Sequence, residues 1–379
     1  MRAASSFVIR AESPARFARA AADSLAAIER PAGAIIFLSG ALAESLPAVA
    51  SAFERTPPGV PILLAGAAGV LTDRGELEGQ SAGAGLVWSG GESDAFIVNE
   101  GGDPDDVGSA LAGALRARTE RSLATALVFA DPRSFSERSL EHLRELPRLN
   151  VLGGGTRADA PLACISAGGK CTTGPMAVMV LRGPHRSIVR FSPACRLLMP
   201  LRRVSEVRGS MVLSIDGEPA LEVLQTVASD LPNQPLVLVA VAPDGPPPQG
   251  GRPELSYRSL QGVDPDRGAV VLSEAVPVGT SLAFAVRDAT AARADLENVA
   301  RELWRETAGA APQFAFFISC AGRGSGLYGS PDIDVRVLRT RFPNLPFAGL
   351  HSAFEIAPSS GRPAVQLYSG VIGIFTAPS

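Results

Sequence analysis

The residues best suited to chemistry lie in two short segments near the C-terminus. Cys320 ends the most strongly strand-like run of the chain and is followed by Ala-Gly-Arg323-Gly. A thiol at a strand end, followed by a Gly-rich turn and an arginine, indicates an anion or electrophile site. The guanidinium would lower the pKa of the thiol, and the turn would offer free N–H groups. The alternative is a small buried hydrophobic residue followed by a turn.

The second segment combines His351, Ser352 and Glu355 within one loop. An imidazole and a carboxylate so close are suited to acid–base chemistry, because histidine titrates near neutrality. No Gly-x-Ser-x-Gly motif surrounds Ser352, and no third partner can be placed, so a hydrolytic triad is not predicted. A structural histidine is the alternative interpretation of His351.

A glycine-rich segment, Gly153, Gly154, Gly155 and Thr156, follows another apolar run and is able to cradle an anion. It matches neither the dinucleotide-binding nor the P-loop spacing, so a familiar nucleotide site is not predicted. Glycines that allow the chain to leave a strand tightly are the alternative interpretation.

The sequence predicts no metal site and no cofactor. Cys164 and Cys171 are separated by six residues, whereas metal-binding pairs are usually closer and need further ligands. The histidines that could supply such ligands are His142, His185 and His351.

The elements that must position these residues recur three times along the chain. Each copy is an apolar run, a helix-like stretch, a break, and a second apolar run that ends in small residues. The copies span residues 34–69, 126–156 and 314–352. Pro61 and Pro346 each lie eight residues before the position of Gly69 or Phe354. Self-similarity of this kind usually decides the architecture.

Two strand-length runs follow each copy, and their turn residues predict a hairpin. The paired runs are 83–88 with 95–98, 176–181 with 187–191, and 364–368 with 370–375. Parallel crossovers mixed with hairpins predict an α/β protein of α+β type. It would have two similar halves of strand-helix-strand-hairpin units, and mixed sheets packed together with helices on their outer faces. The predicted domains are 1–215 and 216–379.

The region between the second and third copies predicts further elements. A strand over 210–215 leads through a turn into a helix, and 243–253 is predicted to be an exposed loop. A helix around 296–304 carries an amphipathic stripe suited to core packing.

Composition narrows the class of protein. The 379 residues suit two domains, and 46% hydrophobic against 19% charged residues predicts a folded chain. A net charge of −3 argues against nucleic-acid binding. No apolar run reaches the roughly 18 residues of a membrane span, no secretory signal opens the chain, and four cysteines form no disulfide framework. A cytoplasmic protein is predicted, with no membrane partner.

Several segments together resemble the FIST family, the F-box and intracellular signal transduction proteins. The third copy, with its Ser-Cys-Ala-Gly-Arg-Gly segment (319–324) and its Pro-x-x-Gly strand (346–349) leading to Glu355, resembles the C-terminal FIST domain. The first two copies and the segments 192–196 and 215–221 are similar to the rest of the family pattern. The resemblance covers nearly the whole chain, and the order and spacing of these motifs carry it.

The resemblance implies a bacterial sensory module rather than an enzyme. Such a module would bind a small ligand, amino acids having been proposed, and signal to an unknown partner in trans because this chain has no room for an output domain. Four residues depart from the family pattern: Phe354, Leu64, Ala65 and Val70 stand where the family has Gly, small or acidic residues. These changes imply a narrower pocket, a different ligand or a scaffolding role.

We therefore expect a ligand pocket at the strand ends, with no catalytic residue. Arg323 would receive a carboxylate, Glu355 a cationic group, and His351 a polar bond that orients the ligand. The pocket would be lined by Cys320, Arg323, Gly349, His351, Ser352 and Glu355, with Gly153, Gly154, Gly155 and Thr156 as a second wall. The alternatives are a thiol-dependent or hydrolytic enzyme that uses Cys320 with His351, and a protein-interaction scaffold without a ligand.

Overall fold

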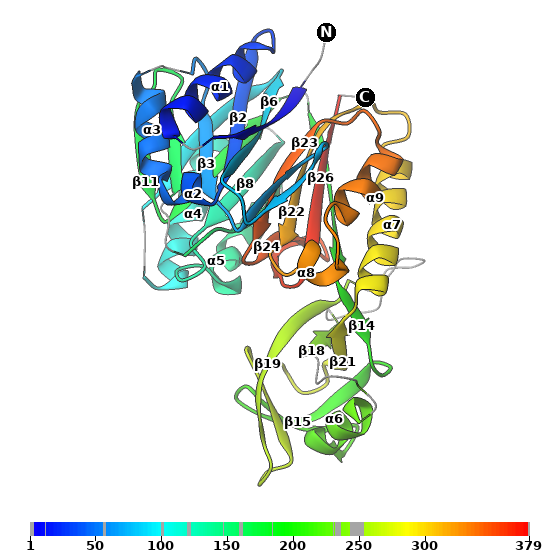
Figure 1. Cartoon of the computed structure of the whole chain (residues 1–379). Coiled ribbons are helices and arrows are strands. Elements are labelled where there is room, and N and C mark those ends of the chain that lie inside the picture. The colour runs from blue at the N-terminus through cyan, green and yellow to red at the C-terminus, as the bar shows by residue number, and fades with distance from the viewer. Residues whose placement is uncertain are drawn as a thin grey trace. The chain divides into compact units, whose positions relative to one another are not determined.

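The computed structural model describes residues 4–11, 13–55, 58–99, 102–119, 123–146, 148–158, 162–183, 185–229, 231, 236–242 and 254–377 (Figure 1). The predicted loop over 243–253 lies outside these residues. The chain divides into two compact units that are interleaved along the sequence. Unit 1 comprises Met1–Ser192, Asp295–Val365 and Ser369–Ser379, and unit 2 comprises Pro193–Ala294 and Gln366–Tyr368.

Unit 1 contains three mixed sheets of six strands each. In spatial order, sheet 1 is β1 (Ala4–Arg10), β6 (Ala82–Ser89), β2 (Pro31–Ser39), β3 (Ile62–Gly66), β10 (Leu162–Ile165) and β11 (Cys171–Gly174). Sheet 2 is β25 (Arg362–Gln366), β24 (Glu355–Ser359), β9 (Leu149–Gly155), β8 (Ala124–Ala130), β12 (Met176–Arg182) and β7 (Glu92–Val98). Sheet 3 is β13 (Arg186–Pro193), β26 (Ser369–Thr376), β22 (Pro312–Cys320), β23 (Phe347–Ser352), β4 (Gly69–Thr72) and β5 (Gly75–Glu78).

Each sheet of unit 1 is built around one copy of the repeated pattern, and the predicted parallel pairing of the two runs is confirmed. The two apolar runs of a copy form a parallel pair, namely β2 with β3, β8 with β9, and β22 with β23. Helices connect the strands of each pair, because parallel strands need a crossover. The connecting helices are α2 (Ala41–Glu44) and α3 (Leu46–Arg55), α5 (Glu137–Glu141) with the 3-10 turn η1 (His142–Glu145), and α8 (Ser325–Tyr328) with α9 (Ile333–Arg341).

The three predicted hairpins are wrong. β6 and β7 lie in different sheets, as do β12 and β13, and likewise β25 and β26. Both runs of each pair are apolar and need strand partners, and the partners that accept them belong to neighbouring sheets. The strands directly after each parallel pair also change sheet, since β4 and β5 join sheet 3, β10 and β11 join sheet 1, and β24 and β25 join sheet 2. Three sheets that exchange strands replace the two similar halves that the sequence suggested.

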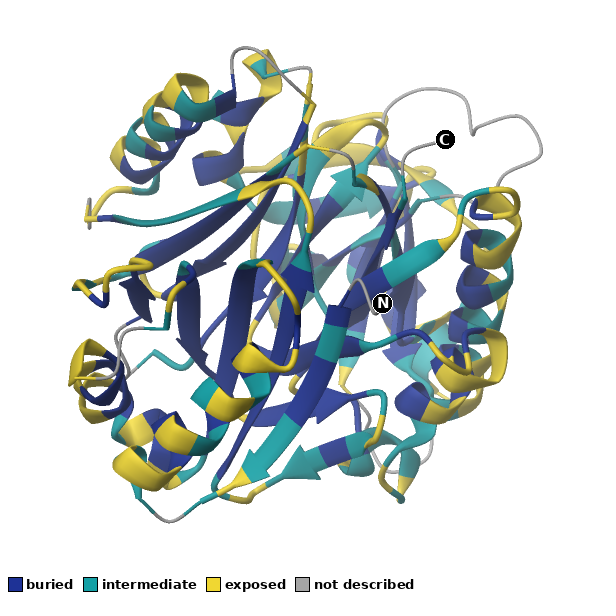
Figure 2. Ribbon diagram, turned by 90° about the horizontal axis from the view of Figure 1, so that it is seen from above, coloured by how far each residue is buried: buried dark blue, intermediate teal, exposed yellow. Residues whose placement is uncertain are grey.

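The main core lies between the inner faces of the three sheets. Side chains alternate along β2, so that Ile35 and Phe37 join this core while Ile36 and Leu38 pack under helices. β22 alternates in the same way, with Phe316 facing the core. Burial on both faces explains why these runs are continuously apolar. Figure 2 shows the strands mainly buried and the helices exposed on their outer sides.

Helices cover the outer faces, as predicted. α1 (Pro14–Ala26) and α3 pack on sheet 1, whereas α7 (Ala289–Glu306) and α9 pack on sheet 3 (Figure 1). α4 (Pro104–Thr119) packs against α5 and η1. The amphipathic stripe predicted around 296–304 is confirmed in α7, where Leu296, Val299 and Leu303 are buried and Trp304 is exposed.

Unit 2 is an antiparallel barrel. The strands β21 (Ser281–Arg287), β15 (Arg202–Arg208), β16 (Met211–Ile215), β20 (Ala269–Leu272), β19 (Ser256–Asp264) and β18 (Val237–Val241) form a closed ring. The short strands β14 (Cys195–Leu197) and β17 (Glu218–Pro219) pair with β21 and β16. The predicted strand, turn and helix are confirmed as β16, a turn, and α6 (Ala220–Ala228). Apolar side chains of the barrel and of α6 form one cluster, which identifies the barrel as a packed core.

Candidate functional site

The predicted site residues gather where β22 and β23 end side by side. The register pairs Ser319 with His351 and Cys320 with Ser352. Successive side chains of a strand point to opposite faces. Ser319 and His351 therefore share the helix-covered face of sheet 3, whereas Cys320 and Ser352 face the inner core. The predicted partnership of Cys320 with His351 is not favoured, because the sheet lies between their side chains.

Gly69 has no side chain, and this lets His351 reach across the sheet. The β4–β5 hairpin, which begins at the last residue of the first copy, extends sheet 3 beside β23, with Leu350 opposite Val70 and Gly69 opposite Glu78. The next residue along β23, His351, therefore lies level with Gly69. A Cβ atom at Gly69 would be 2.8 Å from Cδ2 of His351. Glycine at this position leaves the space in which the imidazole lies over β4 toward β5.

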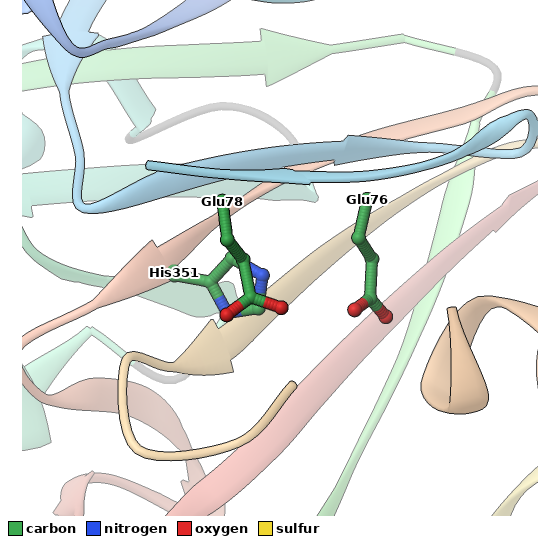
Figure 3. Close-up of side chains that lie close together, drawn as sticks. All are labelled: Glu76, Glu78 and His351. Carbon is green, nitrogen blue, oxygen red and sulfur yellow. The ribbon is translucent and has the colours of Figure 1, made fainter. Parts of the chain in front are cut away.

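Glu76 and Glu78 extend from β5 on the side where His351 lies, with the Glu78 carboxylate beside the imidazole (Figure 3). One ligand atom from each of the three side chains lies within 4.8 Å of the other two. Glu78 Oε1 accepts hydrogen bonds from the N–H (2.9 Å) and the hydroxyl (3.0 Å) of Ser325. Glu76 Oε2 accepts one from the N–H of Asp332 at 3.3 Å. The β5 strand thus presents two acids to one histidine, and both acids also anchor the loop after β22.

Three buried polar atoms on this face have no hydrogen-bond partner among the described residues. They are Glu76 Oε1, His351 Nε2 and Ser319 Oγ. Burial lowers the pKa of His351, although the charge of Glu78 and a hydrogen bond to the Cys320 backbone oppose the shift. Because Nε2 has no partner, Nδ1 makes that bond, and the Nε2 lone pair is left to accept. Burial, followed by the charge of Asp334, raises the pKa of Glu76 to about 7.

Arg323 is buried and bonded within the protein. Its guanidinium contacts Asp334 through Nε (2.7 Å) and one terminal nitrogen (2.9 Å), and that nitrogen also donates to the Tyr328 hydroxyl at 2.8 Å. The other terminal nitrogen donates to the Ser192 carbonyl at 3.1 Å. The side chain is 0% exposed. These bonds hold the loop after β22 in place, and they use the donors that a ligand carboxylate would need.

Glu355 forms a second buried polar cluster, on the inner face. Its carboxylate accepts hydrogen bonds from the Ser352 hydroxyl (2.7 Å), the Ser369 N–H (3.0 Å) and the Ser369 hydroxyl (2.8 Å). Ser352 also donates to the Ser319 carbonyl at 3.2 Å. Burial raises the pKa of Glu355 to about 7, while these hydrogen bonds and the charge of Arg323 oppose the shift. The cluster ties β23, β24 and β26 together.

The predicted second wall does lie beside residues 353–355, but protein atoms fill the space. The Gly155 N–H donates to the Phe354 carbonyl at 2.7 Å, and a Cβ at Gly155 would lie 2.5 Å from the Phe354 ring. A Cβ at Gly154 would meet the Phe354 carbonyl oxygen at 2.5 Å. Phe354 stacks on Phe135 with ring centroids 5.3 Å apart. Thr156 donates to the Ala130 carbonyl, so this segment serves close packing of sheets 2 and 3.

Gly153 and Gly349 occupy equivalent positions opposite the first strand of their pairs. A Cβ would lie 1.8 Å from the Val128 carbonyl oxygen at Gly153, and 1.7 Å from the Phe317 carbonyl oxygen at Gly349. Both glycines are needed for the close approach of the two strands. For Gly153, the alternative interpretation from the sequence, a glycine that allows tight strand geometry, agrees with this contact.

Glu355→Gln is expected to flatten the pH dependence of stability. The folded-state pKa of Glu355 lies above the ordinary value of 4.5. The stability that its neutral form contributes is therefore fully present below about pH 4.5 and is lost as the pH rises through 7. Between pH 5 and 8 the wild type should lose about 2–3 kcal/mol more than the variant. Urea denaturation across this range measures the difference. If the free energy of unfolding depends on pH in the same way in the wild type and the variant, the raised pKa of Glu355 is wrong.

Glu76 and Glu78 are the site residues that sequence reasoning missed. They follow the first copy, whereas His351 belongs to the third, and nothing in their local pattern sets them apart from other surface acids. The sequence signal that could have pointed to this site was Gly69, because the alignment of the copies placed it at the position of Phe354.

Two family models match the chain, the FIST N domain over residues 33–218 and the FIST C domain over residues 220–358. The predicted domains, 1–215 and 216–379, stay a prediction.

An uncharacterized protein of Mycobacterium tuberculosis is 29% identical over 323 residues, which are 82% of each chain. An uncharacterized protein of Mycobacterium bovis is 29% identical over 376 residues, or 94% of this chain and 93% of the relative. Within the described residues, no helix is long and apolar enough to cross a membrane. The two matched models together span most of the sequence, and the chain belongs to the FIST family, as its motifs predicted.

Proposed function

We propose that this protein is a sensory module of signal transduction that binds a small, positively charged ligand at the ends of β22 and β23. FIST domains are associated with signal transduction. The observation that carries the proposal is the set of unpartnered atoms on one face of sheet 3: Ser319 Oγ, His351 Nε2 and Glu76 Oε1. A buried polar atom without a partner costs about 1–3 kcal/mol, and a ligand that supplies the missing bonds removes that cost.

The chemistry of these atoms favours a cation. Glu76, Glu78 and the Nε2 atom of His351 are acceptors, and the acids Asp332 and Asp334 lie close to Glu76. The buried cation of the region, Arg323, is already paired with Asp334. We therefore propose an amine or another cation in place of a ligand carboxylate held by Arg323. Glu76 and Glu78 take the role of cation acceptor that the sequence suggested for Glu355.

The thiol-dependent enzyme gains no support from the geometry. Cys320 is buried on the inner face, and Gly322 N–H donates to its sulfur at 3.4 Å. A nucleophile must lie within hydrogen-bond reach of its base, whereas His351 faces the opposite side of the sheet. The scaffold alternative, the downstream partner and the cytoplasmic location stay predictions from the sequence.

Ligand binding is tested by thermal shift with amines and amino acids, on protein freed of metal with EDTA. We expect stabilisation by at least one amine. Calorimetric affinity for that amine should fall at least about tenfold in Glu76→Gln, which removes a charge worth about 1.4 kcal/mol or more in binding.

The matched control is Glu206→Gln, which removes an exposed carboxylate on β15 of unit 2. This variant should bind the amine as the wild type does. The proposal fails if no compound among several hundred metabolites raises the melting temperature, or if both variants lose affinity equally.

A further inference from the structure

We infer that Glu76, Glu78 and His351 bind a divalent transition-metal ion, for which Zn²⁺ and Mn²⁺ are suitable probes. The inference names the ligand class of the proposed site and rests on that site. It is carried by the spacing of three ligand atoms and by two unpartnered atoms that belong to the same three side chains.

The spacing suits a single ion. One ligand atom from each side chain lies within 4.8 Å of the others. Zinc lies about 2.0–2.2 Å from nitrogen and carboxylate ligands, so two ligands of a tetrahedral ion are about 3.4 Å apart. Side-chain rotations that move the ligand atoms by up to about 1 Å close that difference.

Two of the three side chains are buried and still have an atom free to bind. His351 is 4% exposed and Glu76 is 8% exposed, yet His351 Nε2 and Glu76 Oε1 have no partner among the described residues. The ring edge that carries Cδ2 and Nε2 lies over Gly69, which pairs with Glu78. The free nitrogen is therefore on the edge of the ring nearest β5, and Figure 3 shows the imidazole beside the Glu78 carboxylate.

The neighbours of the three side chains orient them as metal ligands are usually oriented. A histidine that binds a metal commonly donates its other ring N–H to a backbone carbonyl or a carboxylate. His351 makes a hydrogen bond to the Cys320 backbone. Glu78 is held through Oε1 by Ser325, which leaves its Oε2 available. These bonds within the protein orient the side chains, so the site is preorganised.

One nitrogen and two carboxylate ligands favour Zn²⁺, Mn²⁺ or Fe²⁺ over Mg²⁺ and Ca²⁺, which prefer oxygen alone. Three protein ligands leave a coordination position for water or for an exchangeable ligand. Ser319 lies next to His351 in the register, with its hydroxyl oxygen unpartnered, and can hydrogen-bond to that water. The sequence predicted no metal because it offered no suitable cysteine pair, whereas this ligand set comes from the hairpin after the first copy and from the third copy.

The test is a calorimetric titration of the EDTA-treated full chain with ZnCl₂ and MnCl₂. We expect one ion per chain. His351→Asn and Glu78→Gln should each weaken binding at least about 100-fold, because loss of even an outer-shell partner costs 10–100-fold. The spectrum of the Co²⁺ form should change in His351→Asn, since a nitrogen ligand is lost. His142→Asn is the matched control, because His142 is a histidine of η1 that contacts Asp105 at the surface.

A further variant keeps all three ligands. Gly69→Ala places a Cβ 2.8 Å from His351 Cδ2, so it should displace the imidazole and weaken metal binding about 10–100-fold. Circular dichroism of each variant reports whether it is folded.

The inference is overturned if the wild type binds neither probe below millimolar concentration, or if His351→Asn binds as tightly as the wild type. If an amine binds in a manner that depends on Glu76 while no metal does, the sensor proposal stands and the metal inference is wrong. If neither an amine nor a metal binds, both are wrong.

Discussion

Arg323→Leu is expected to lower the free energy of unfolding of unit 1 by about 3–5 kcal/mol. The guanidinium is 0% exposed and the Asp334 side chain 1% exposed. Removing one partner leaves the Asp334 carboxylate buried without its counter-charge, which is costly in a medium of low polarity. The Tyr328 hydroxyl and the Ser192 carbonyl lose bonds as well.

Denaturation followed by tryptophan fluorescence measures this loss, because both tryptophans, Trp88 and Trp304, belong to unit 1. The matched control is Arg116→Leu, whose exposed pair with Glu145 should contribute less than about 1 kcal/mol. The double variant Arg323→Leu/Asp334→Leu should recover part of the stability. A loss below 1 kcal/mol in Arg323→Leu would show that the pair is not buried as described, and would return Arg323 to the list of ligand-binding residues.

Gly349→Ala is expected to lower the free energy of unfolding by about 3 kcal/mol or more. The new Cβ would lie 1.7 Å from the Phe317 carbonyl oxygen, and no rotamer change relieves a clash between two backbone-fixed atoms. β22 and β23 would have to separate at the end of the pair that carries Ser319 and His351. Ligand or metal binding should therefore weaken together with stability.

Gly113→Ala provides the control for the same chemical change. Gly113 is exposed in α4, and a Cβ there would meet nothing within 4 Å. Alanine should raise the free energy of unfolding by roughly 0.5–1 kcal/mol, because it favours the helix. Equal effects of the two substitutions would contradict the close approach of β22 and β23.

Much of the fold could be predicted because its signals are local. Continuous apolar runs such as 314–320 predicted strands, and the helix-like stretches between runs predicted parallel pairs. The order of the motifs was enough to recognise the family. The hairpins were mispredicted because a Gly-Gly turn, as at Gly90 and Gly91, specifies a change of direction and not the sheet that the next strand joins.

The candidate site was predicted in part. Cys320, His351 and Ser352 were expected at strand ends, and they do lie at the ends of β22 and β23. Cys320 and Ser352 lie on one face of sheet 3 and His351 on the other, because successive side chains of a strand point to opposite faces. Which residues share a face follows only once the register of β22 and β23 is known. The bonds of Arg323 depend on Asp334 and on the Ser192 carbonyl, and the latter belongs to a distant segment.

The sequence by itself determined the three copies, the parallel strand pairs and the family, because short-range patterns of apolar residues, glycines and turns encode them. Only the tertiary structure decided which sheet each strand joins, because strand partners are chosen by packing between segments far apart in the chain. For the same reason only the tertiary structure brought Glu76 and Glu78, which follow the first copy, to His351 of the third copy, with Gly69 leaving the space between them.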